Sequence, residues 1–417
     1  MFYQFLKVLV GFALKVFFKR IHVTGSENIK NDRPQLIASN HPNGFMEPLV
    51  MACYFPKDLH FLVRGDVFDK SWLRPLLLST HQIPIFRFKD GFSKLRENAH
   101  TIDDSLHVLE DNKDLLIFVE GSTESIKKLR SLQKGVARIA FQTLEKNPTL
   151  NLEIVPVGIN FTFLKHFNEE VMVRAGKPIL VKPYFEVYQQ DKNKGFETLL
   201  LDLYKAMSIN IVHIDDQYRL PVFEDMVVAV RQKYKNLPYF PVLKHNNQRL
   251  DEEIHLADQI NTLPTTEFQK LSGELSAFKS YLKTQGISLI DLLKKPLNMF
   301  TAVILILGFI PMLIGALLHS IPILIGYIFT KVKVKQKEFK SSLLFVVSLV
   351  MTLLMYIIIA ILSFVYQWPW WVIPMMLALG LWARYYHRIM TSIRLFKNKA
   401  TKEASQNLDL LFAQYFN

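Results

Sequence analysis

The sequence predicts an α/β fold, in which a mixed sheet is flanked by helices, followed by a helical membrane region. Between residues 21 and 212, short β-rich apolar runs alternate with helical patterns, which is typical of layered α/β domains. Beyond residue 295 the chain becomes strongly hydrophobic, and residues 343–365 carry no charge. The chain has 417 residues, which is too long for one ordinary domain.

Residues 21–212 form the predicted α/β domain. The expected strands are apolar runs bounded by Gly, Pro, Asn or Asp, and they include residues 35–39, 59–63, 115–119 and 153–161. Helical patterns at residues 93–109 and 134–143 lie between them. Residues 213–294 are polar, follow a helical pattern and carry no chemical motif, so we expect a helical extension.

Residues 1–20 are expected to form a helix that contacts a membrane. Apolar residues cover most of its circumference, the lysines Lys7, Lys15 and Lys19 fall largely on one side, and acidic residues are absent. The segment lacks the small-residue cleavage site of a signal peptide. The alternative is a helix that packs in the core of the following domain.

Residues 295–390 are expected to form membrane hairpins. Residues 343–365 are long enough to cross a bilayer at about 1.5 Å per residue. Tryptophans at 368, 370 and 371 favour the headgroup interface and predict a turn there. Residues 297–330 are short for two crossings, so we expect a re-entrant hairpin bent at Pro311 and Pro322.

Basic segments suggest how the chain is oriented. Residues 331–340, KVKVKQKEFK, and the segment after Leu381 are both basic, which predicts that both lie on the cytoplasmic side. Residues 391–417 would then form a cytoplasmic helix. We therefore expect an integral membrane protein whose α/β domain faces the cytoplasm, most simply at a bacterial inner membrane.

The composition favours anionic partners. The formal net charge is +13 at pH 7, which suits anionic lipid headgroups, phosphorylated substrates, an acidic carrier protein or nucleic acid. A solvated excess of charge is the simpler alternative. The single cysteine, Cys53, leaves this sequence no intramolecular disulfide and no cysteine metal cluster. We expect no cofactor, no metal site and no nucleic-acid partner.

The first motif that suggests chemistry is NHPNGFMEP at residues 40–48. A regular helix would place His41 and Glu47 on different faces. The intervening Pro-Asn-Gly predicts a loop instead, and on a loop the carboxylate can orient the imidazole as a general base. The alternative is a plain loop histidine and a glutamate that favours a helix N-terminus.

Three further segments follow in order. They are IPIFR at residues 83–87, preceded by Arg64; FVEGSTES at residues 118–125; and VPVGI at residues 155–159. A strand that runs into Glu-Gly-Ser makes a tight turn whose backbone N–H groups can face an anion. Several cations come soon after this turn: Lys127, Lys128, Arg130 and Lys134. Each segment alone would usually be an ordinary strand and turn.

In this order and spacing, the four segments resemble the PlsC-like glycerolipid acyltransferase family over residues 21–179. The resemblance implies an acyltransferase-type mixed sheet and direct transfer of a fatty acyl group from acyl-CoA or acyl-carrier protein. The implied acceptor is a hydroxyl of glycerol-3-phosphate or a lysophospholipid, with His41 as base and Glu47 as its catalytic partner. Arg87 would hold the acceptor phosphate. The expected substrate-binding residues are Asn43, Arg64, Arg87, Glu120, Gly121, Ser122 and Lys134.

Three departures from the family pattern keep other acceptors and functions open. Glu47 replaces an aspartate and lies one position later, Val119 replaces a proline, and Thr123 stands where an arginine is common. A lyso-aminolipid acceptor, or a catalytically inactive member of the fold that binds membranes, are therefore alternatives. A membrane-tethered nucleic-acid binder rests on the charge alone. The expected partners are membrane lipids and the acyl donor, including an acidic carrier protein.

Overall fold

The computed structural model describes the chain except residues 87–97, 164–169, 237–238, 395–398 and 417. It forms two compact units. The first contains Met1–His213 and Leu243–Leu250, and the second contains Ile214–Val242 and Asp251–Asn417.

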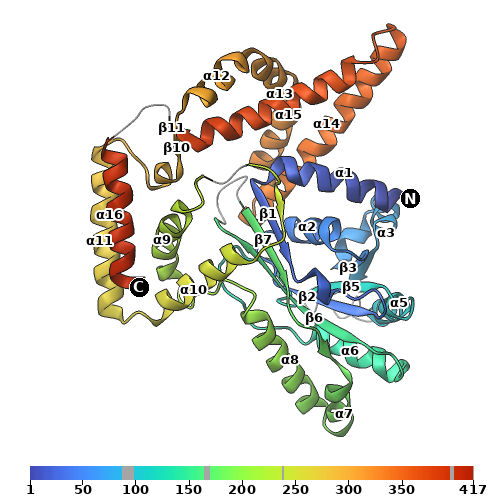
Figure 1. Ribbon diagram of the computed structural model, residues 1–417. Helices are drawn as coiled ribbons and strands as arrows, with labels where there is room; N and C mark the ends of the chain where they lie inside the picture. The colour runs from blue at the N-terminus through green and yellow to red at the C-terminus, as the bar shows by residue number, and fades with distance from the viewer. Residues whose placement is uncertain (87–97, 164–169, 237–238, 395–398, 417) are drawn as a thin grey trace. The chain divides into compact units, whose positions relative to one another are not determined.

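A mixed β-sheet forms the centre of the first unit (Figure 1). In the described residues it has nine strands, in the order β4–β3–β5–β2–β6–β7–β1–β9, with β8 paired to β6. The strands are β1 (Arg20–Thr24), β2 (Gln35–Ser39), β3 (Leu59–Arg64), β4 (Gln82–Ile85), β5 (Asp114–Phe118), β6 (Glu153–Phe161), β7 (Glu170–Ala175), β8 (Ile179–Leu180) and β9 (Leu243–Lys244).

The strand directions create one edge at which most strands end. Strands β4, β3, β5, β2 and β6 are parallel, whereas β7 runs antiparallel to β6 and parallel to β1. The carboxyl ends of the five parallel strands therefore share one edge, the usual position of a ligand site in open α/β sheets. The predicted α/β fold with a mixed sheet is confirmed.

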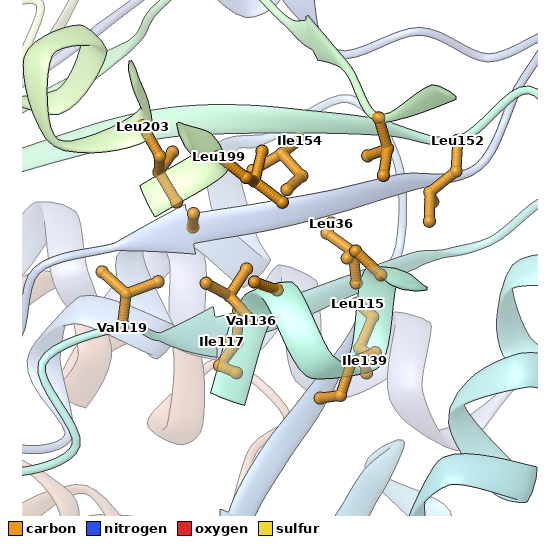
Figure 2. Packing of buried hydrophobic residues seen from close by; sticks show 14 of the residues in the cluster. Leu36, Leu115, Ile117, Val119, Val136, Ile139, Leu152, Ile154, Leu199 and Leu203 are labelled. Atoms are coloured by element: carbon orange, nitrogen blue, oxygen red, sulfur yellow. The ribbon is translucent and has the colours of Figure 1, made fainter. Parts of the chain in front are cut away.

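Helices flank this sheet, as predicted. They are α1 (Phe2–Phe17), η1 (Ser26–Asn28), α2 (Met46–Tyr54), η2 (Gly65–Asp69), α3 (Arg74–Ser79), α5 (Asn98–Glu110), α6 (Gly135–Lys146), α7 (Lys182–Gln190) and α8 (Lys192–Ser208). Figure 2 shows side chains of β2, β5 and β6 meeting those of α6 and α8, among them Leu36, Leu115, Ile117, Val136, Ile139, Ile154, Leu199 and Leu203. Each such fully buried aliphatic side chain contributes about 2 kcal/mol to stability.

Polar contacts hold helix α1 on the first unit. The Lys7 ammonium lies 3.0 Å from the Asp58 carboxylate, and the Tyr54 hydroxyl donates to the Gly11 carbonyl at 2.7 Å. Because these contacts fix the inner side of the helix, its outer side stays exposed, including Phe2, Phe5, Val8 and Phe12.

Three rings stack where β3 and β4 begin. The ring centroids of Tyr3 and His81 lie 4.2 Å apart, and those of His81 and His60 lie 4.4 Å apart. Burial, and then the neighbouring His81, lower the pKa of His60 to about 4. The stack therefore favours the neutral imidazole of His60.

This lowered pKa predicts acid sensitivity. Between the ordinary pKa of 6.5 and a folded value of about 4, the unfolded chain binds a proton that the folded chain does not. The contribution of His60 to stability is therefore complete above about pH 6.5 and is lost as the pH falls toward 4. We expect His60→Gln to flatten the pH dependence of the denaturation midpoint of the detergent-purified protein over this window.

His107→Gln is the matched control, because the His107 side chain is 77% exposed. It should keep the wild-type pH dependence. Equal slopes for His60→Gln and wild type would contradict the assignment of the effect to the ring stack.

The second unit is mostly helical in its described residues, with one short two-stranded sheet. Its elements are η4 (Gln217–Arg219), α9 (Leu220–Gln232), most of α10 (Gln248–Thr262), α11 (Thr265–Thr284), η5 (Leu289–Leu293), β10 (Lys295–Pro296), α12 (Met299–Leu307), α13 (Phe309–Lys333), η6 (Lys337–Phe339), α14 (Lys340–Val365), α15 (Val372–Ser392), β11 (Ile393–Arg394) and α16 (Lys399–Phe416). The ion pair of Arg231 with Glu253 is buried and joins α9 to α10.

Two helices, α13 and α14, are long and apolar enough to cross a membrane. Few of their side chains are buried in the structure, as expected of helices that face lipid rather than a protein core. This supports association of the chain with a membrane. A turn that contains the tryptophans at 368, 370 and 371 connects α14 to α15.

The helix is interrupted at Gly308, between α12 and α13, and not at Pro311 or Pro322, where bends were expected. Pro311 lies in the first turn of α13, where a missing N–H costs little, and α13 continues through Pro322. At the break, the Trp382 indole donates to the Gly308 carbonyl at 2.8 Å, and the Tyr386 hydroxyl donates to the Leu305 carbonyl at 3.1 Å. The Gly308 carbonyl also accepts the backbone N–H of Met312 at 3.0 Å, so the Trp382 indole is a second donor to it. The two bonds from Trp382 and Tyr386 tie the break to α15.

A polar contact joins the membrane-length helices near their middles. Nε2 of His319 on α13 lies 3.0 Å from the Tyr356 hydroxyl on α14. Nδ1 of His319 lies 2.9 Å from the Gly315 carbonyl. A Cβ at Gly380 on α15 would lie 2.5 Å from the His319 ring, so glycine is needed for this approach.

Candidate active site

His41 lies on a loop at the carboxyl edge of the sheet. Strand β2 ends at Ser39, and α2 begins only at Met46, so the segment between them is irregular. Gly44 adopts a positive φ of 61°, which glycine tolerates best. This is the looped connection that the spacing of His41 and Glu47 requires.

The side chains of His41 and Glu47 face one another. Nδ1 of His41 lies 3.6 Å from Oε2 of Glu47, and the two side chains are 16% and 0% exposed. This separation exceeds a hydrogen bond, but catalytic contacts in unliganded sites are often long and tighten with substrate. With Nδ1 directed at the carboxylate, Nε2 is the nitrogen left to accept a proton.

Two further contacts fix the position of the imidazole. The ring stacks on Phe118, with centroids 3.9 Å apart and planes inclined by 13°. The preceding residue, Asn40, donates to the Ile159 carbonyl at 3.0 Å and accepts from the Ile159 N–H at 2.8 Å. The fourth segment of the predicted motif set therefore holds the first in place.

Glu120 joins the first and third segments. Its Oε2 accepts from the backbone N–H of His41 at 3.0 Å, and its Oε1 accepts from the backbone N–H of Arg130 at 2.9 Å. The Arg130 guanidinium lies 2.9 Å from Oε2 of Glu120 and donates to the Ser122 hydroxyl at 2.7 Å. The carboxylate is almost fully buried, so these donors offset the cost of removing it from water.

Val119 makes a bond that proline could not. Its backbone N–H donates to the Ser39 carbonyl at 3.1 Å and so extends the pairing of β5 with β2 toward His41. Gly121 follows with a positive φ of 71° in the tight turn. The departure from the family pattern at Val119 thus adds a contact at this edge.

The other expected site residues have different surroundings. The Asn43 backbone N–H donates to Glu47. Arg64 ends β3 at the same edge and pairs with Asp66, but its side chain is 52% exposed. Lys134 precedes α6, and its ammonium lies 5.7 Å from the centroid of the Phe196 ring. Arg87 lies outside the described residues.

Arg130, one of the cations that follow the turn in sequence, is a structural partner of Glu120 and Ser122. The Lys127 ammonium is also engaged, since it donates to the Phe161 carbonyl at 2.6 Å. Neither contact is visible in the motif itself, because both depend on how the turn after β5 folds back over the sheet edge. The stacking of Phe118 under His41 was likewise missed, although strand pairing places Ser39 opposite Phe118.

The sequence of this region matches a known family. Residues 20–160 match the family described as Acyltransferase, which includes both His41 and Glu120. These residues form an acyltransferase-family domain. The resemblance predicted from the four segments is therefore confirmed at the level of this domain.

Curated relatives resemble only part of the chain. An uncharacterised acyltransferase of Schizosaccharomyces pombe is 28% identical over 123 residues, which cover 29% of this chain and 18% of the relative. Glycerol-3-phosphate O-acyltransferase 1 of Saccharomyces cerevisiae is 27% identical over 148 residues, which cover 34% of this chain and 19% of the relative. Lyso-ornithine lipid O-acyltransferase of Rhizobium meliloti is 26% identical over 143 residues, which cover 34% and 46%.

The chain therefore spans less than half the length of each of these relatives. Among solved structures, the 1-acyl-sn-glycerophosphate acyltransferase PlsC of Thermotoga maritima is 17% identical with a TM-score of 0.34. That comparison covers 47% of this chain and 79% of the PlsC chain.

The network around Glu120 generates a stability prediction. Glu120→Leu would leave the backbone N–H groups of His41 and Arg130 without their acceptor and would remove the buried partner of the Arg130 guanidinium, and breaking a buried pair costs about 3 kcal/mol. We expect a lower denaturant midpoint for the detergent-purified variant than for wild type. Glu124→Leu is the control, because its carboxylate is 54% exposed and lies 3.5 Å from the same guanidinium. It should cost less than about 1 kcal/mol, and equal losses in the two variants would contradict the prediction.

Proposed function

We propose that this protein is an O-acyltransferase that moves a fatty acyl group from acyl-CoA or acyl-carrier protein onto a hydroxyl of glycerol-3-phosphate or a lysophospholipid. The observation that carries the proposal is the facing of His41 and Glu47 at the sheet edge, inside a domain that matches the acyltransferase family. A neutral imidazole oriented by a buried carboxylate is a suitable general base.

In the proposed reaction, Nε2 of His41 accepts the proton of the acceptor hydroxyl. The oxygen attacks the thioester carbonyl carbon, the new C–O ester bond forms, and the C–S bond breaks. The thiolate leaving group then takes the proton from the imidazolium, so His41 is regenerated and no acyl-enzyme forms. Glu47 stabilises the positive charge that His41 carries between these two steps.

Two acceptor classes have support from separate observations. The similarity of this chain to glycerol-3-phosphate O-acyltransferase 1 of Saccharomyces cerevisiae supports a phosphorylated acceptor. The similarity to lyso-ornithine lipid O-acyltransferase of Rhizobium meliloti supports an aminolipid acceptor. So does Thr123, which stands where the family pattern commonly has an arginine. Arg64 could also bind a phosphate. Its guanidinium is half exposed, and its surface ion pair with Asp66 is weak enough to be replaced by a contact with the acceptor.

We also propose that helix α1 rests on the membrane from which the acceptor comes. The helix exposes Phe2, Phe5, Val8 and Phe12 and carries lysines but no carboxylate. An apolar stripe with cationic neighbours suits an interface that contains anionic lipid. The acyltransferase domain would then act at the cytoplasmic face, with α13 and α14 crossing the same bilayer.

The direct test measures acyl transfer by the detergent-purified full chain. Labelled acyl-CoA and acyl-carrier protein are each offered with glycerol-3-phosphate, a lysophosphatidic acid and a lyso-ornithine lipid. We expect His41→Ala to lower kcat by about 10²–10⁴-fold with the preferred pair, since a general base contributes that much. Glu47→Gln should lose less, because Glu47 acts through His41.

His107→Ala provides the matched control on an exposed histidine and should retain full activity. If His41→Ala and wild type transfer label equally, the proposed mechanism is wrong. If wild type transfers no label to any acceptor while phospholipid vesicles bind it, the chain is an inactive member of the fold. Preference for the lyso-ornithine lipid would replace the phosphorylated acceptor by the aminolipid.

A further inference from the structure

The turn between α13 and α14 is dense in positive charge. We call residues 331–340 the lysine turn; it holds five lysines and one carboxylate, Glu338. The lysines are Lys331, Lys333, Lys335, Lys337 and Lys340, and all five are exposed. The turn therefore presents a net charge of +4 to whatever surrounds it.

The flanking helices set the depth of this turn in a membrane. Residues 309–329 and 343–365 carry no charged side chain and rise about 31 and 35 Å as helices. The hydrocarbon core of a bilayer is about 30 Å thick, so both segments fill it. Because the lysines follow directly at the ends of these segments, the lysine turn lies at the level of the lipid headgroups.

Close packing next to the turn gathers the charges. A Cβ at Gly326 on α13 would lie 2.3 Å from Oγ of Ser348 and 3.2 Å from Cδ1 of Leu344, both on α14. Thr330 and Ser342, which flank the turn on the two helices, are buried. Lysines from both helix ends and from the connecting residues therefore share one small region of the surface.

The opposite end of α14 has a different chemistry. It is followed by Tyr366, Trp368, Trp370 and Trp371, which are exposed aromatic side chains without charge. Aromatic residues of this kind anchor in either interface, whereas a lysine cluster attracts only an anionic one. The two ends of the hairpin would thus distinguish between leaflets of different charge.

We propose that the lysine turn binds the phosphate groups of anionic phospholipids and enriches them around the membrane hairpin. Each lysine near an anionic surface contributes a preference of about fivefold. Because several lysines act on one region, anionic lipid should be retained there even where neutral lipid is in excess. A turn that is only solvated would show no lipid preference. The proposal concerns the second unit alone and does not depend on His41 or on acyl transfer.

The test measures which lipids stay with the protein. The full chain is reconstituted in vesicles of phosphatidylcholine with a minor fraction of phosphatidylglycerol, extracted with its lipids into polymer discs, and the retained lipids are quantified by mass spectrometry. We expect the ratio of phosphatidylglycerol to phosphatidylcholine to exceed the bulk ratio about fivefold or more at low salt. The excess should shrink at high salt, because screening weakens the attraction.

Replacing all five lysines of the turn by glutamine should bring the ratio back toward the bulk value. A matched variant removes five exposed lysines of the first unit instead: Lys177, Lys182, Lys192, Lys194 and Lys205. It should keep the wild-type enrichment, and so should His41→Ala. An unchanged ratio in the lysine-turn variant, or an equal loss in the matched variant, would overturn the proposal.

Discussion

The candidate site depends on the carboxylate of Glu120, which lies inside the protein and holds two other parts of the chain, the His41 loop and the segment that carries Arg130. It accepts the backbone N–H of His41 and two donors of Arg130, one of them a backbone N–H. A buried carboxylate is stable only if hydrogen-bond donors surround it, and buried N–H groups of loops in turn need a hydrogen-bond acceptor. This mutual requirement fixes the His41 loop, and the pairing with Glu47 and the stacking on Phe118 follow from where that loop lies.

Sequence reasoning predicted the parts of the site that depend on local chemistry. Pro-Asn-Gly cannot continue a helix, so the loop between His41 and Glu47 followed from composition. Side-chain partners across the sheet could not be predicted, because they depend on strand register. Arg130, which the sequence showed only as one of several cations after the turn, contacts Glu120, and the expected substrate-binding residue Lys134 faces Phe196. The catalytic and substrate-binding roles themselves stay predictions.

The same contrast holds for the fold. The alternation of β-rich apolar runs with helical patterns predicted the α/β sheet, and the long uncharged apolar segments predicted α13 and α14. Both signals extend over many residues, so they can be recognised in the sequence. The position of the helix break was not predictable in this way. Proline at the start of a helix is compatible with it, whereas Gly308 breaks the chain where Trp382 and Tyr386 supply hydrogen bonds from α15. Those donors lie far away in the sequence.

The bond from the Val119 N–H to the Ser39 carbonyl bears on how sequence motifs are interpreted. In the usual family pattern a proline ring would stiffen this position, and the ring would forbid the bond. Here rigidity comes from strand pairing instead of a ring. A residue that departs from a consensus can therefore keep the backbone rigid by a different interaction. Motif scores that count every such departure as a loss will underrate these sequences.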